Sequence, residues 1–138
     1  MTQRKLRTTL DTNIWAAGIS LEYSICAKII NACEIGMFDT VVTREIVSEV
    51  VGVLRGYFGK SDDEAYYWYW TIHTLAEVIE PISDIRECRD PDDDKFLVCA
   101  VDGKCDYLVS SDKDLTDMET IRGIPIIKPG QFYNIILE

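Results

Sequence analysis

Residues 90–112 read DPDDDKFLVCAVDGKCDYLVSSD, and they contain a complete helix-to-strand unit. Asp90 before Pro91 is typical of an N-cap followed by the first residue of a helix, and Gly103 is typical of a helix end. Tyr107–Val109 is a short apolar run of the kind that forms a buried strand. Acidic residues resume after this strand, so the unit predicts carboxylates next to both a helix start and a strand end.

The rest of the chain repeats this alternation of strand and helix. The strands predicted, by residue number, are 6–10, 38–42, 76–80, 107–109 and 125–127. The helices predicted are 24–34, 44–55, 61–72, 90–103 and a terminal turn or helix at 131–137. Because the strands are nearly continuous apolar runs, we expect a parallel sheet buried on both faces. The fold class expected is α/β: a three-layer α/β/α sandwich with a central, mainly parallel sheet of about five strands.

Composition and charge limit the classes of function. The 138 residues are 47% hydrophobic and 28% charged, without repeats or linker-like segments, so we expect a single domain over residues 1–138. No stretch approaches the roughly 18 apolar residues of a membrane span and no signal-peptide pattern follows Met1, which favours a cytoplasmic protein without a membrane partner. The net charge of −10 disfavours binding of nucleic acid by charge alone. A polyanionic substrate would need metal ions or a positively charged partner protein.

The sequence argues against zinc and against a calcium loop. The five cysteines are odd in number and include no Cys-x-x-Cys pair, which favours buried free thiols. His73 is the single histidine, so the chain lacks a zinc-ligand set, and we expect His73 to pack or to hydrogen-bond. The run from Asp90 superficially matches a calcium loop, but Lys95 stands where that loop needs glycine and Val101 where it needs glutamate.

Acidic residues gather at the edge of the sheet where parallel strands end. Asp11 follows the first predicted strand, and Asp112 and Asp114 follow the fourth. Residues 92–94 open a helix at the same edge, and Glu49 lies about one and a half turns into the helix after the second strand. Carboxylates crowded in this way repel one another unless a cation is present. All-oxygen ligands suit Mg²⁺ or Mn²⁺, and the reaction implied is phosphodiester hydrolysis.

Three segments resemble the signature blocks of PIN domains. They are residues 10–14 (LDTNI), 89–97 (RDPDDDKFL) and 108–115 (LVSSDKDL). The resemblance extends over nearly the whole chain, including residues 123–129, and is strongest to the VapC-like branch, the toxin components of toxin-antitoxin systems. It implies metal-dependent cleavage of single-stranded or structured RNA by a homodimer that an antitoxin holds inactive.

The resemblance also implies the residues of the site. The metal-binding and catalytic acids are Asp11, Glu49, Asp94 and Asp112. Within residues 92–94, Asp94 is chosen because Leu97 and Ala100 continue the family pattern of acid, apolar and small residues on one helix face. The supporting residues expected are Asp114 as an accessory metal ligand, and Asn13 and Ser111 as polar contacts.

Other classes of function stay open at this point. The main alternative is a PIN-fold scaffold or binding module with a vestigial acidic pocket, although the complete set of acids argues against it. A small-molecule phosphohydrolase or a phospho-acceptor domain would need a lysine after a late strand, for which Lys128 is the only rough candidate. The aromatic segment 66–70 could stack bases, but five consecutive aromatic residues on one helix favour a core combined with a protein interface.

Overall fold

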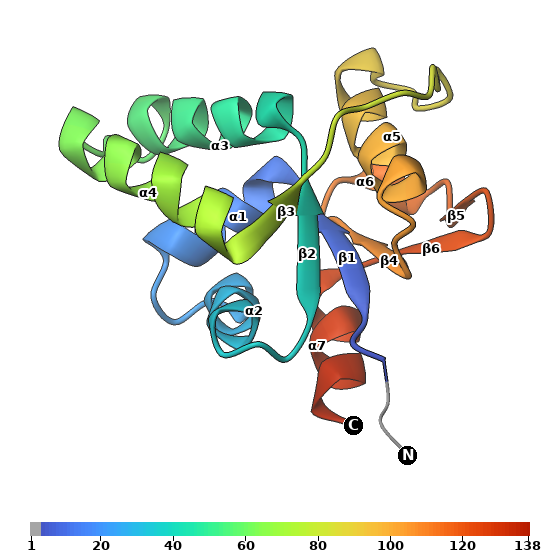
Figure 1. Cartoon of the computed structure of the whole chain (residues 1–138), viewed down its shortest axis with the longest axis horizontal. Helices are drawn as coiled ribbons and strands as arrows, with labels where there is room; N and C mark the ends of the chain where they lie inside the picture. The colour runs from blue at the N-terminus through green and yellow to red at the C-terminus, as the bar shows by residue number, and fades with distance from the viewer. Residues whose placement is uncertain (1–3) are drawn as a thin grey trace.

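A computed structural model describes residues 4–138 of the chain. Its centre is a six-stranded sheet with the strand order β3-β2-β1-β4-β6-β5 (Figure 1). The strands are β1 (Arg7–Leu10), β2 (Asp39–Val42), β3 (Ala76–Val78), β4 (Tyr107–Val109), β5 (Thr120–Ile121) and β6 (Ile124–Ile127). Neighbouring strands pair in parallel, except that β5 is antiparallel to β6. The expected α/β class with a mainly parallel sheet is confirmed.

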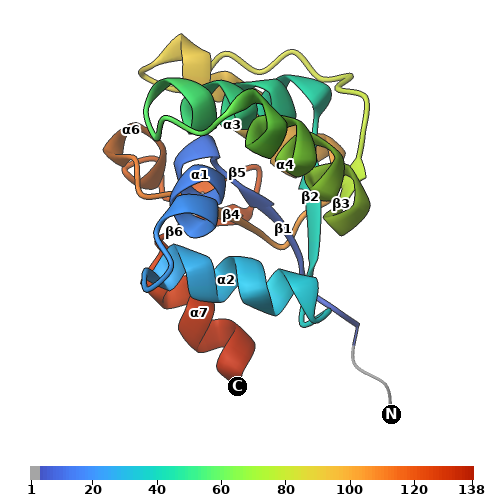
Figure 2. The same ribbon diagram turned by 90° about the vertical axis from the view of Figure 1, so that its left-hand side faces the viewer.

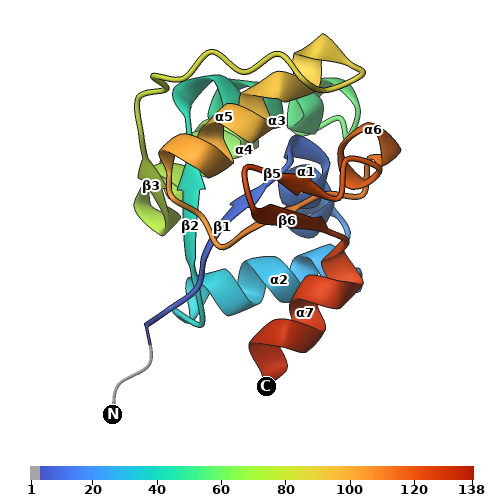
Figure 3. The ribbon, with the colours of Figure 1, turned by 90° about the vertical axis from the view of Figure 1, so that its right-hand side faces the viewer.

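Helices cover both faces of the sheet. They are α1 (Thr12–Ser20), α2 (Ile25–Glu34), α3 (Arg44–Gly56), α4 (Asp62–Leu75), α5 (Asp94–Asp102), α6 (Lys113–Thr116) and α7 (Pro129–Leu137), with a 3-10 turn η1 (Pro91–Asp93) before α5. In Figure 1, α1, α2 and α4 lie on one side of the sheet and α5 lies on the other. Figure 2 looks onto the α1–α2 side, where α7 packs beside α2, and Figure 3 looks onto the α5 side.

The direction of the chain explains these layers. From β1 the chain moves outward to β2 and β3, and it then returns through α5 to β4 on the opposite side of β1. Right-handed crossovers in opposite directions place their helices on opposite faces. The strand order therefore reverses between β1 and β4, and the crevice beyond the carboxyl ends of these two strands is the usual place for a ligand site.

Three short elements were not expected from the sequence. Helix α1 begins directly after β1, in a segment with four fully or largely buried residues and no polar face that would mark an amphipathic helix. Strand β5 has two residues and α6 has four, which is too short for a periodic pattern. The turn between β5 and β6 holds Arg122 and Gly123 at positive φ. Because β5 pairs with β6, the sheet has six strands instead of about five.

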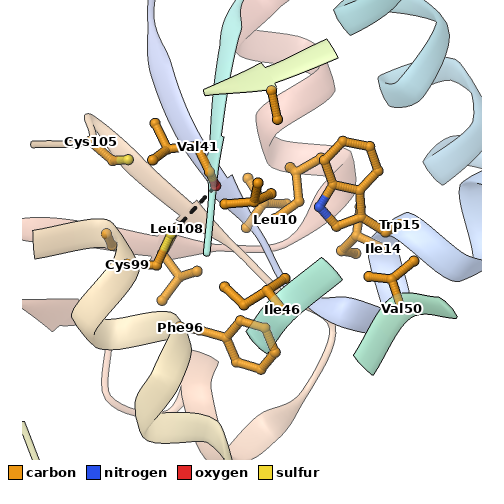
Figure 4. Packing of buried hydrophobic residues seen from close by; sticks show 14 of the residues in the cluster. Leu10, Ile14, Trp15, Val41, Ile46, Val50, Phe96, Cys99, Cys105 and Leu108 are labelled. Atoms are coloured by element: carbon orange, nitrogen blue, oxygen red, sulfur yellow. Dashed lines mark hydrogen bonds between the residues drawn. The ribbon is translucent and has the colours of Figure 1, made fainter. Parts of the chain in front are cut away.

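One hydrophobic core fills the space between the sheet and the helices. Figure 4 shows Trp15 and Ile14 of α1 near Leu10 of β1, with Phe96 of α5 and Leu108 of β4 close by. The five named side chains are between 0% and 2% exposed. Burial of large side chains on this scale contributes about 1.5–3 kcal/mol for each of them.

The sequence-based expectations for cysteine and histidine are confirmed. All five cysteines are free and buried. The thiol of Cys99 points at the carbonyl oxygen of Val41, with a sulfur-to-oxygen distance of 3.4 Å (Figure 4). His73 hydrogen-bonds through Nδ1 to the carbonyl oxygen of Tyr69, which lies one turn earlier in α4.

Candidate metal-binding active site

Asp11 is the buried centre of the site. It follows β1 and caps α1, because its Oδ1 accepts a hydrogen bond of 2.9 Å from the backbone N–H of Ile14. The hydroxyl of Ser110 donates to Oδ2 of Asp11. The residue is 3% exposed, and burial raises the pKa of its carboxyl to about 6, although hydrogen bonds from Ser110, Ile14 and Ser111 oppose the shift. A carboxyl in this position favours binding either a proton or a metal cation.

Ser110 connects Asp11 to Asp112. Its Oγ accepts a 2.9 Å hydrogen bond from the backbone N–H of Asp112, while its hydroxyl proton is donated to Asp11. Asp112 in turn caps α6, because its Oδ1 accepts a 2.9 Å hydrogen bond from the N–H of Asp114. The side chain that supports the acids is therefore that of Ser110, whereas Ser111 is exposed and acts on Asp11 through its backbone.

Asp93 lies against Asp112. Its Oδ2 is buried and has no hydrogen-bond partner among residues 4–138. Burial first, then contact with the Asp112 carboxyl and repulsion from Asp90 and Asp11, raise the pKa of Asp93 to about 7. An orphaned carboxylate oxygen facing other carboxylates is the arrangement that a bound cation would satisfy.

A second group of carboxylates shares Asp93. Within the described residues, one ligand oxygen from each of Asp90, Asp93 and Asp114 lies within 4.8 Å of the others. Arg89 partly neutralises this group, since its Nε lies 3.1 Å from Oδ1 of Asp114. Asp93 thus belongs to both groups of acids, one toward Asp11 and one toward Asp114.

Asp94, the third acid expected from the sequence, hydrogen-bonds to the backbone. Its Oδ1 accepts hydrogen bonds from the backbone N–H groups of Glu87, at 3.1 Å, and Cys88, at 2.8 Å. It therefore fastens the loop that precedes η1 to the start of α5. The acids that raise the pKa of Asp93 are Asp112, Asp90 and Asp11, whereas the hydrogen bonds of Asp94 come from the backbone. The geometry supports Asp93 in the place that the sequence pattern gave to Asp94.

Glu49 reaches the site from α3, which Thr43 caps through a 3.3 Å hydrogen bond to the N–H of Ile46. The hydroxyl of Thr12 donates to Oε1 of Glu49 at 2.5 Å. The ammonium group of Lys95 pairs with Oε2 of Glu49, and the Lys95 side chain is only 12% exposed. Sequence reasoning missed Lys95, whose position in the first turn of α5 next to the aspartates was the available signal.

The donor set fits a hard divalent cation. The side chains that converge are carboxylates from Asp11, Asp93 and Asp112, with Glu49 beside Thr12, while the nearby thiol of Cys88 hydrogen-bonds to the carbonyl oxygen of Asp114. Oxygen donors of this kind suit Mg²⁺ or Mn²⁺. The residues present therefore match an ion of that class.

Comparison with known proteins identifies the family of the chain. A family model described as PIN domain matches residues 7–114, and the chain belongs to the PIN domain family, a family of metal-dependent nucleases. The chain is similar to a solved structure titled "Crystal structure of PAE2754 from Pyrobaculum aerophilum", with 13% sequence identity and a TM-score of 0.62. That match covers 96% of this chain and 90% of the other, and it supports the fold. No curated protein matches the chain.

Within residues 4–138, every helix is too short or too polar to cross a membrane.

Proposed function

We propose that this protein is a divalent-metal-dependent ribonuclease that hydrolyses phosphodiester bonds in RNA. The observation that carries the proposal is the buried, unpartnered Oδ2 of Asp93 beside Asp112, with the buried Asp11 close enough to raise the pKa of Asp93. Ionising carboxyls that lie this close together costs free energy, and a bound cation offsets that cost. Membership of a family of metal-dependent nucleases supports the same conclusion.

In this proposal Asp11, Asp93 and Asp112 hold Mg²⁺ or Mn²⁺, and Glu49 and Asp114 are accessory ligands. When bound, the ion supplies a hydroxide nucleophile and neutralises charge on the phosphate. Ser110 orients Asp11 by donating its hydroxyl proton to Oδ2, and it fixes the distance to Asp112 by accepting the N–H of that residue. Asn13 is exposed in the first turn of α1, two residues after Asp11, where its amide is accessible to a substrate.

The biological role we propose is that of the toxin in a toxin-antitoxin pair, acting on cytoplasmic RNA. A homodimer and an antitoxin would cover apolar surface, and α4 presents three aromatic side chains that are between 51% and 68% exposed, Tyr66, Tyr67 and Trp70. Light scattering of the purified protein would measure the dimer directly.

A non-catalytic scaffold is the second candidate, and a specific observation favours it. Two of the acids already have cationic partners within the chain, since Lys95 pairs with Glu49 and Arg89 with Asp114. Such pairs reduce the need for a metal ion. Asp11, Asp93 and Asp112 have no such partner among the ion pairs of residues 4–138, which is why we prefer the nuclease.

Cleavage of labelled RNA with Mn²⁺, Mg²⁺ or EDTA tests the proposal and the choice of acid together. Asp11→Asn and Asp93→Asn should abolish metal-dependent cleavage, since each removes a ligand charge. Asp94→Asn is the matched control, because its amide oxygen can still accept the N–H groups of Glu87 and Cys88. Loss of activity in Asp94→Asn alone would return the role to Asp94. Absence of cleavage by the unmodified protein on all RNAs would favour the scaffold.

A further inference from the structure

A groove without charged residues lies between α1 and the C-terminal part of α3. Its volume is about 450 Å³, and its lining residues are Asn13, Ala17, Val53, Tyr57 and Phe58. This volume falls within the range of roughly 300–1,000 Å³ that is typical of small-molecule sites. The chain has a net charge of −10, but none of the lining residues is a carboxylate that would repel a phosphate group of a ligand.

The groove and the candidate active site share the helices α1 and α3. Asn13 is two residues after Asp11, and the intervening Thr12 donates its hydroxyl proton to Glu49. Val53 follows Glu49 by four residues in α3, which is about 6 Å along the helix axis. Tyr57 follows one turn later, so the groove extends from the acids along α1 and α3 within reach of nucleotides that flank a phosphate held there.

The side chains of the groove suit a nucleobase. The ring of Tyr57 is 82% exposed, and it stands edge-on to Phe58 with the ring centroids 4.9 Å apart at an interplanar angle of 81°. Its exposed face is available for stacking, an interaction that tolerates every base. The amide of Asn13 offers both a donor and an acceptor for the polar edge of a base. Because the chain is acidic, uncharged contacts of this kind would add RNA affinity that does not depend on its few basic residues.

We propose that this groove is a subsite for an unpaired nucleobase of the RNA, with Tyr57 as the stacking residue and Asn13 as the contact to the base edge. The proposal rests on the proposed ribonuclease function and adds that the substrate is single-stranded next to the scissile bond. Continuity with the acids favours a nucleotide over a protein segment, since only a nucleotide places a phosphate at one end of the groove and a flat ring at the other.

Steady-state cleavage of labelled single-stranded oligoadenylate in Mn²⁺ tests the subsite. Tyr57→Ala should raise KM about tenfold with a smaller change in kcat, which matches the loss of one stacked base. Tyr57→Trp, which keeps an aromatic ring, should leave KM close to that of the unmodified protein. Tyr23→Ala is the matched control, because Tyr23 is a highly accessible tyrosine, 92% exposed, that lies between α1 and α2 and does not line this groove. Circular dichroism of each variant checks that the fold is intact.

Oligoadenylates that carry one abasic nucleotide supply the second measurement. At one position the missing base should raise KM for the unmodified protein about as much as Tyr57→Ala does, and it should add nothing in the Tyr57→Ala variant. Fluorescence anisotropy of the same RNAs in EDTA should show the same ranking of affinities without catalysis. Independent effects of the base and of Tyr57, or equal behaviour of Tyr57→Ala and Tyr23→Ala, would overturn the subsite while leaving the ribonuclease intact. An unmodified protein that neither binds nor cleaves the RNA would overturn both.

Discussion

The substitution Asp11→Asn should change how the stability of the metal-free protein depends on pH. Burial raises the pKa of Asp11 from 3.8 to about 6. The folded protein therefore binds this proton more tightly than the unfolded chain, and ionising the buried carboxyl above pH 4 costs stability. A shift of about two units corresponds to about 3 kcal/mol. This loss should develop between about pH 4 and pH 6 and persist above.

Asparagine has nearly the same shape and does not titrate. Its oxygen can accept the N–H of Ile14, and its amino group can donate to Ser110, so two of the three hydrogen bonds of Asp11 have a replacement. We expect the two proteins to have similar free energies of unfolding near pH 4. By pH 7 the variant should be more stable than the unmodified protein by about 3 kcal/mol.

Urea unfolding in EDTA, followed by tryptophan fluorescence at a series of pH values, measures this difference. Mn²⁺ at a hundred times its dissociation constant should then stabilise the unmodified protein by about 2.7 kcal/mol at pH 7 and the variant far less. A stability difference that stays constant from pH 4 to pH 7 would refute the argument that Asp11 is ionised against a burial cost.

Two further predictions concern Lys95 and two glycines. Lys95→Met should tighten Mn²⁺ binding, measured by calorimetry, about fivefold, or about 1 kcal/mol, because the ammonium group no longer competes with the ion for Glu49. The variant Lys113→Met, at an exposed lysine, controls for the general loss of a positive charge. Equal effects of the two substitutions would contradict the competition. Gly18→Ala should lower the free energy of unfolding by about 1–3 kcal/mol, because its Cβ would meet α2 atoms at 2.5 and 2.8 Å. Gly52→Ala, in α3, should instead raise the free energy of unfolding by about 0.5–1 kcal/mol in the same urea assay, because no atom lies within 4 Å of the added Cβ. Changes of the same sign in both variants would show that helix packing does not distinguish the two sites.

Much of the site was visible in the sequence because local rules placed it. Asp11 and Asp112 follow apolar runs that had to become parallel strands, and the carboxyl ends of such strands meet at one edge. Both residues also cap the next helix, a role that favours aspartate by itself. The amphipathic pattern of α3 likewise fixed the turn from which Glu49 reaches Thr12, the residue after Asp11.

The orientation of neighbouring side chains depended on tertiary contacts instead. Asp93 and Asp94 are chemically identical in the sequence, and the choice between them follows from the N–H groups of Glu87 and Cys88, which need an acceptor and take Asp94. The pairing of Lys95 with Glu49 joins residues that are 46 positions apart. Periodicity describes which face of an element is buried, and it carries no information about such partners.

The sequence by itself therefore determined the α/β class, the edge of the sheet that carries the acids and the kind of ligand those acids suit, because these follow from periodicity, capping and the chemistry of carboxylates. Only the tertiary structure decided that Ser110 supports Asp11, that Asp93 faces Asp112, and that a groove ending at Tyr57 adjoins the acids. Each of these depends on where two distant segments cross, and that position is set by the packing of the whole core.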